Sequence, residues 1–143
     1  KEKVVKLIDP KITKNFDEIR DISLIGNKNK LNQLLSEIDL TSDDSFYILN
    51  LINLKLQKLT QLIFNKENTN NIRELIDNCK PPIFWKEKQS YIDLVIKWDE
   101  DRINVVLNKS KNAELEIKKH TAKNDVVIKK LLLDICTQAS TFK

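Results

Sequence analysis

The chain of 143 residues is long enough for one domain with a modest core, and its net charge of +4 with 32% charged residues is ordinary for a solvated helix surface. A single Gly excludes a Gly-rich phosphate loop, and one His with two separated Cys excludes a zinc site made from these residues. No apolar stretch approaches the about 20 residues that span a bilayer, so we expect a soluble protein. The two cysteines have no metal-ligand spacing and indicate the reducing cytoplasm.

The first 15 residues are basic and weakly patterned, and Asp9-Pro10 interrupts them. We interpret residues 1–15 as a linker or the end of a preceding domain, and residues 16–143 as a helical domain. Because the chain contains no Met, we expect it to be part of a longer protein. Residues 16–25 predict a short amphipathic helix that Gly26 closes with a left-handed cap, and residues 31–38 predict a second helix.

A cluster of capping residues precedes the longest apolar stripe of the chain. Thr41 and Asp44 have the spacing of a capping box, in which each side chain accepts a backbone N–H of the other residue. The stripe that follows is spaced by 3, 4, 3 and 4 residues and consists of Leu49, Ile52, Leu56, Leu59 and Ile63. It predicts a long helix that packs against more than one partner and forms the spine of the fold.

Pro81-Pro82 predicts a rigid corner, because two adjacent prolines cannot lie inside a helix. The corner ends a short helix that contains Cys79, and it is followed at once by Phe84 and Trp85. We expect both aromatic side chains to enter a neighbouring core, where replacement of either by Ala would cost about 3–5 kcal/mol. The next helix is expected to run to Trp98.

The last part of the chain predicts two more helices. Carboxylates at residues 99–101 favour the start of one helix, whose middle contains the small residues Ser110 and Ala113. Apolar positions between residues 127 and 139 predict the final helix, and Cys136 lies among them, so we expect both cysteines to be reduced core residues. Since no strand pattern occurs, the fold class is all-α, a bundle of about five to seven helices.

Three stretches together resemble a known family. These are Pro81-Pro82-Ile83-Phe84-Trp85-Lys86, the helix that ends at Trp98, and the run from Ala113 to Lys118. They are similar to the carboxy-terminal domain of the delta subunit of bacterial DNA polymerase III, and the similarity covers residues 20–140. A short helix break at Gly26 resembles the family too, whereas Trp85 stands where Phe is usual.

The resemblance implies a role in DNA replication without catalysis. In this family the domain is a collar piece, which packs into a ring with the collar domains of the motor subunits and delta-prime. The assembly is the clamp loader, which opens the sliding clamp and loads it onto primed DNA. The domains of delta that grip the clamp would precede this chain. The resemblance implies no cofactor and no metal, and partners that include the other clamp-loader subunits and primer–template DNA.

Two groups of residues are candidates for these contacts. The candidate subunit interface combines the broad apolar stripe with the small-residue face, and comprises Leu49, Ile52, Leu56, Ser110 and Ala113. The candidate DNA contact is a basic cluster near a helix end, made of Lys118, Lys119, His120 and Lys123. The alternative for this cluster is a cationic terminus that complements the helix dipole. A family signature at Pro81, Pro82, Phe84, Trp85 and Trp98 is expected to serve the core. A free-standing helical adaptor or nucleic-acid-binding module remains the alternative function.

Overall fold

The computed structural model describes residues 10–66 and 68–140, with side chains from residue 16 onward. Within these ranges the chain forms helices and no strand, which confirms the all-α prediction. The α-helices are α2 (Pro10–Ile25), α3 (Lys28–Ser36), α4 (Ser42–Lys66), α5 (Ile72–Asp77), α6 (Lys88–Lys97), α7 (Glu100–Lys119) and α8 (Asn124–Ser140). Two short 3-10 helices, η1 (Trp85–Glu87) and η2 (Thr121–Lys123), precede α6 and α8.

The helix boundary at the amino-terminal end differs from the prediction. Helix α2 begins at Pro10, inside the segment that we interpreted as a linker or the end of a preceding domain, whereas the sequence predicted a helix only from residue 16. Proline suits the first turn of a helix because its missing N–H has no partner there in any case. The prediction for residues 1–9 lies outside the described part of the chain.

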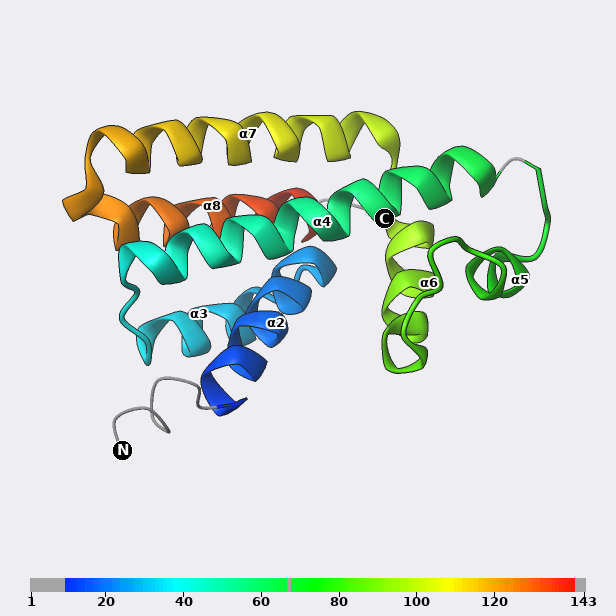
Figure 1. The fold of residues 1–143 in the computed structure, drawn as a ribbon, viewed down its shortest axis with the longest axis horizontal. Helices are drawn as coiled ribbons and strands as arrows, with labels where there is room; N and C mark the ends of the chain where they lie inside the picture. The colour runs from blue at the N-terminus through cyan, green and yellow to red at the C-terminus, as the bar shows by residue number, and fades with distance from the viewer. Residues whose placement is uncertain (1–9, 67, 141–143) are drawn as a thin grey trace.

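The long helices form the body of the molecule (Figure 1). Helices α4, α7 and α8 run alongside one another, and α2 with α3 packs across α8 and α4. The shorter helices α5 and α6 pack against the carboxy-terminal half of α4, at the end of the molecule remote from η2. The aromatic segment before α6 and the basic segment after α7 therefore lie at opposite ends of the bundle.

The predicted helix caps are present. The Asp44 N–H donates to Thr41 Oγ1 and the Thr41 N–H donates to Asp44 Oδ2, both at 3.1 Å, which is the reciprocal pattern of a capping box. Gly26 has φ of +89° and ends α2, where a left-handed residue is needed. The Asp99 side chain accepts the Arg102 N–H at 2.9 Å and caps α7.

Helix α4 is the spine of the core, as its apolar spacing predicted. Its side chains at Leu49, Ile52 and Leu56 are 0–3% exposed and face helices from both sides. The small residues Ser110 and Ala113 of α7 are also buried, and the Ser110 hydroxyl donates to Asn53 Oδ1 of α4 at 2.9 Å. The small-residue face thus permits close packing, but its partner is α4 of the same chain.

The prediction of a subunit interface at these residues is therefore wrong, because they are not exposed on the surface. All of its members lie in the core, and they are Leu49, Ile52, Leu56, Ser110 and Ala113. Their helical spacing correctly indicated burial. The residues of α4 are covered by helices of the same chain, among them α7 and α8. Cys79 and Cys136 are buried free thiols, as predicted, and burial raises the pKa of the Cys136 thiol. None of the described helices is both long and apolar enough to span a bilayer.

Candidate functional site

The proline corner carries its two aromatic side chains on the surface. Phe84 is 58% exposed and Trp85 is 70% exposed, so the prediction that both enter the core is wrong. The core positions of this segment are taken by Ile83, at 8% exposure, and by Trp98, at 1%. Trp98 is thus the only member of the aromatic signature that serves the core as expected.

Backbone geometry explains which residues turn inward. Phe84 has non-helical backbone angles, φ −57° and ψ 134°, and the 3-10 turn starts only at Trp85. Because Phe84 does not continue a helical period, the burial of Ile83 does not bring the neighbouring ring inside. Phe84 and Tyr91 are seven residues apart, which would place them on one face of a continuous helix, but α6 begins only at Lys88.

The corner is attached to α4 by side-chain hydrogen bonds to its backbone. The Lys58 ammonium donates to the Pro81 carbonyl at 2.8 Å, and the Gln61 amide donates to the Lys80 carbonyl at 3.2 Å. Pro81 and Pro82 themselves are exposed. A shallow hollow of about 220 Å³ lies beside them and is lined in part by Phe84.

Phe84 and Trp85 form a pair of exposed rings with cations nearby. Their ring centroids are 6.0 Å apart at an interplanar angle of 54°, a tilted arrangement. The Lys86 ammonium lies 5.5 Å from the Trp85 ring centroid, within the range of a cation–π contact. We call the exposed group of Pro81, Pro82, Phe84, Trp85 and Lys86 the aromatic corner.

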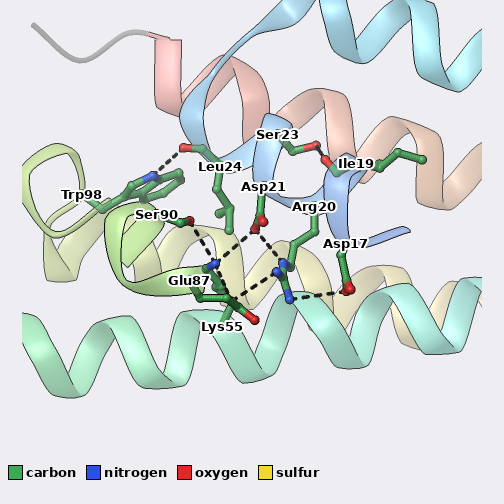
Figure 2. A network of polar contacts seen from close by, with 10 residues as sticks. All are labelled: Asp17, Ile19, Arg20, Asp21, Ser23, Leu24, Lys55, Glu87, Ser90 and Trp98. Carbon is green, nitrogen blue, oxygen red and sulfur yellow. Dashed lines mark hydrogen bonds and ion pairs between the residues drawn. The ribbon is translucent and has the colours of Figure 1, made fainter. Parts of the chain in front are cut away.

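A buried charge network holds the base of the aromatic corner (Figure 2). Lys55 of α4 is 2% exposed, and its ammonium donates to Glu87 Oε1 of η1 and to Ser90 Oγ of α6, both at 3.1 Å. The Asp21 carboxylate of α2 lies 3.2 Å from the same ammonium. The network therefore joins α2, α4 and the turn that bears Trp85.

Arg20 is the second cation of this network. It is 7% exposed, and its Nε donates to Asp21 Oδ1 at 2.8 Å, while Nη2 lies 3.7 Å from Glu87 Oε1. Burial lowers the pKa of Arg20, but the hydrogen bond to Asp21 and the nearby carboxylates outweigh it, so the pKa is raised. The site therefore favours the charged form of Arg20.

The pKa values of two further groups beside the network, Tyr91 and Asp17, are also raised. Burial is the main reason why the pKa of Tyr91 is raised to about 12, and the negative charge of Glu87 adds to the effect. The Lys55 ammonium lies 4.4 Å from the centre of the Tyr91 ring. Burial likewise raises the pKa of Asp17, against the opposing charge of Arg20. These contacts satisfy the buried charges within the protein, which is the property of a structural tie between helices.

The basic cluster predicted for DNA contact does come together at one end of the bundle. Lys118 and Lys119 lie in the last turn of α7, His120 follows as its C-cap, and Lys123 belongs to η2. All four side chains are exposed. Lys118 also lies 3.2 Å from Glu114, so part of its charge is offset locally.

The sequence reasoning missed the charge network, although one signal for it exists. Lys55 lies three residues after Ile52 and four before Leu59, on the buried stripe of α4. A lysine at such a position needs carboxylate partners, because a buried charge is unfavourable without them. The carboxylates come from residues far away in sequence, and only the fold shows that they are Asp21 and Glu87.

Comparison with known proteins identifies no relative. No protein-family model matches the chain, and neither a curated protein nor a solved structure matches it. Among the described residues, no group of three or more His, Cys, Asp or Glu side chains is placed to hold a metal ion.

Proposed function

We propose that this chain is a collar-type domain of a clamp-loader delta subunit, and that it associates with the other subunits through the aromatic corner. Two features support the proposal: the motif similarity across residues 81–86, 98 and 113–118, and the all-α bundle. Its task in the assembly is association, without a reaction of its own.

The observation that carries the proposal is the exposure of Phe84 and Trp85. Large exposed aromatic side chains are unusual on a surface that has no partner, and Trp is enriched among residues that dominate interface energies. The hydrogen bonds from Lys58 and Gln61 fix the corner before any partner arrives. Such preorganisation reduces the entropy that association would otherwise lose.

A second candidate function, binding of single-stranded DNA, is favoured by the cations around the same rings. Lys86 lies over Trp85, the Lys58 ammonium of α4 donates to the Pro81 carbonyl, and Lys80 directly precedes the corner. Exposed aromatic rings beside lysines are the elements of a base-stacking platform, worth about 1–3 kcal/mol per stacked base. The basic cluster at residues 118–123 remains a separate candidate for phosphate contact, with the helix dipole as its alternative explanation.

Native mass spectrometry tests the association directly. The chain, alone and within its full subunit, would be mixed with the motor and delta-prime subunits of a clamp loader from its own source. We expect a complex that contains the wild-type protein and is depleted at least about tenfold by Phe84→Ser with Trp85→Ser. Val126→Ser, which alters an exposed aliphatic side chain on α8, is the control and should assemble normally. Failure of the wild-type protein to join any such complex would refute the clamp-loader assignment.

Tryptophan fluorescence tests the second candidate. The variant Trp98→Phe leaves Trp85 as the sole tryptophan, so its emission reports on the corner alone. Stacking on an oligothymidine strand should quench this emission and should weaken as salt is raised. Unchanged emission in an excess of the oligonucleotide would exclude base stacking at the corner while leaving protein association open.

A further inference from the structure

A groove between α2 and α6 forms a second surface, separate from the aromatic corner. It has a volume of about 560 Å³ and an open shape. Its lining consists of Asp17, Glu18, Asp21, Ile22, Ile25, Ser90, Asp93 and Leu94. Figure 2 shows Asp17, Asp21 and Ser90 on the two elements that flank it. The groove lies along α6, beyond the turn that carries Phe84 and Trp85.

The groove combines an apolar floor with an acidic rim. Ile22, Ile25 and Leu94 supply the aliphatic part, and Ile25 is 39% exposed although it is a large apolar residue. Glu18 and Asp93 are exposed on the two opposite helices. Among the residues that the structure describes, no lysine or arginine belongs to the lining, in a chain whose net charge is positive.

Two buried cations compensate one carboxylate of the lining, Asp21, so the rim charge open to a ligand comes mainly from the exposed Glu18 and Asp93. Arg20 and Lys55 approach from the buried side, where Asp21 and Glu87 already face them at 2.8 to 3.7 Å. Asp17 lies 3.9 Å from Arg20, at the limit of an ion pair. The raised pKa of Asp17, caused mainly by burial, agrees with a carboxyl group whose charge is incompletely compensated.

We propose that this groove binds a basic amphipathic helix of a partner protein, with aliphatic side chains on the floor and lysine or arginine side chains at the rim. The part of α2 between Asp17 and Ile25 that lines the groove is about 12 Å long, at about 1.5 Å per residue. This length matches about two turns of a docked helix. Helices commonly bind grooves of this kind through apolar anchors one turn apart. Phosphates would be repelled by the same carboxylates, so nucleic acid does not fit. The inference goes beyond the proposed function and does not depend on it.

A synthetic peptide tests the groove. The probe is a helical peptide with leucines at positions i and i+4 and lysines on both flanks, and its control carries glutamates in place of the lysines. Titration of the 143-residue chain, followed by amide chemical shifts, should show saturable binding of the lysine peptide, with changes concentrated on α2 and α6. Raising the salt should weaken it, because the rim contacts are exposed charges. The glutamate peptide should not bind.

Matched charge reversals separate the groove from general electrostatics. Glu18→Lys with Asp93→Lys should weaken the lysine peptide at least about tenfold. Glu74→Lys with Glu116→Lys changes the net charge equally at exposed positions on α5 and α7, and should have a much smaller effect. Circular dichroism verifies that each variant is folded. Absence of saturable binding, shift changes centred elsewhere, or equal effects of the two charge reversals would each overturn the inference. The corner variant, Phe84→Ser with Trp85→Ser, should leave peptide binding unchanged, so the outcome is independent of the proposed function.

Discussion

The ion pair between Lys55 and Glu87 should dominate the stability of the buried network. Glu87→Gln keeps an oxygen acceptor but removes the charge that faces Lys55 at 3.1 Å and Arg20 at 3.7 Å. Loss of one partner from a fully buried pair costs about 3–5 kcal/mol. The Lys55 side chain is 1% exposed, but that of Glu87 is 41% exposed, so water screens part of the loss. We therefore expect the free energy of unfolding to fall by about 2 kcal/mol.

A double-mutant cycle isolates the pair. Lys55→Met removes the cation and keeps the length of the side chain. In the double variant with Glu87→Gln neither member of the pair is charged, and Asp21 and Arg20 keep their contact with each other at 2.8 Å. The double variant should lose less stability than the sum of the two single variants, by at least about 1 kcal/mol. Lys130→Met, which breaks an exposed pair with Asp134 at 3.6 Å, should change stability by less than about 0.5 kcal/mol.

Urea unfolding followed by circular dichroism measures all of these variants. For a chain of this size, a loss of about 2 kcal/mol corresponds to a melting temperature lower by about 6 °C. Additivity of the two single variants within about 0.3 kcal/mol would show that the two side chains do not interact in the folded protein. The reasoning on the charge network would then be refuted.

Three further substitutions test other contacts by the same unfolding assay. Trp98→Phe removes the 2.8 Å hydrogen bond from the indole N–H to the Leu24 carbonyl, and should cost about 1–3 kcal/mol; wild-type stability would show that the bond is dispensable. Gly26→Ala places a Cβ at φ of +89° and within 3.1 Å of the backbone of α8, and should cost about 1–2 kcal/mol; an unchanged free energy of unfolding would contradict this strain. Tyr91 remains protonated in the folded state up to a pKa of about 12, compared with 10.0 in the unfolded chain, so its stabilising effect is complete below pH 10 and is lost as the pH rises toward 12. Tyr91→Phe should reduce this alkaline loss by up to about 2.7 kcal/mol; equal alkaline profiles of wild type and Tyr91→Phe would refute the assignment.

The regular part of the fold was predictable because local rules and tertiary packing agree there. The spacing of Leu49, Ile52 and Leu56 indicated the buried face of α4, and the cap residues Thr41 and Asp44 located its start. These signals act within a few residues of the sequence, so they require no knowledge of the partner helix.

The exposed residues were predicted poorly, because the direction in which a side chain points depends on where a helix ends. The non-helical backbone at Phe84 places its ring outside, and no periodicity in the sequence reports that change of direction. For Ser110, the small side chain indicated close packing but not whether the partner was another subunit or α4. The partners of Lys55 came from segments 32 and 34 residues away, beyond the reach of any local pattern.

Assembly of the full subunit with the motor and delta-prime subunits, measured by native mass spectrometry, tests the central claim most directly. If the aromatic corner is a subunit contact, wild type and Val126→Ser should both enter the complex, and the folded variant Phe84→Ser with Trp85→Ser should be depleted at least about tenfold. Equal incorporation of all three proteins would show that the corner is not the contact, and the absence of any complex with the wild-type subunit would contradict the clamp-loader role itself.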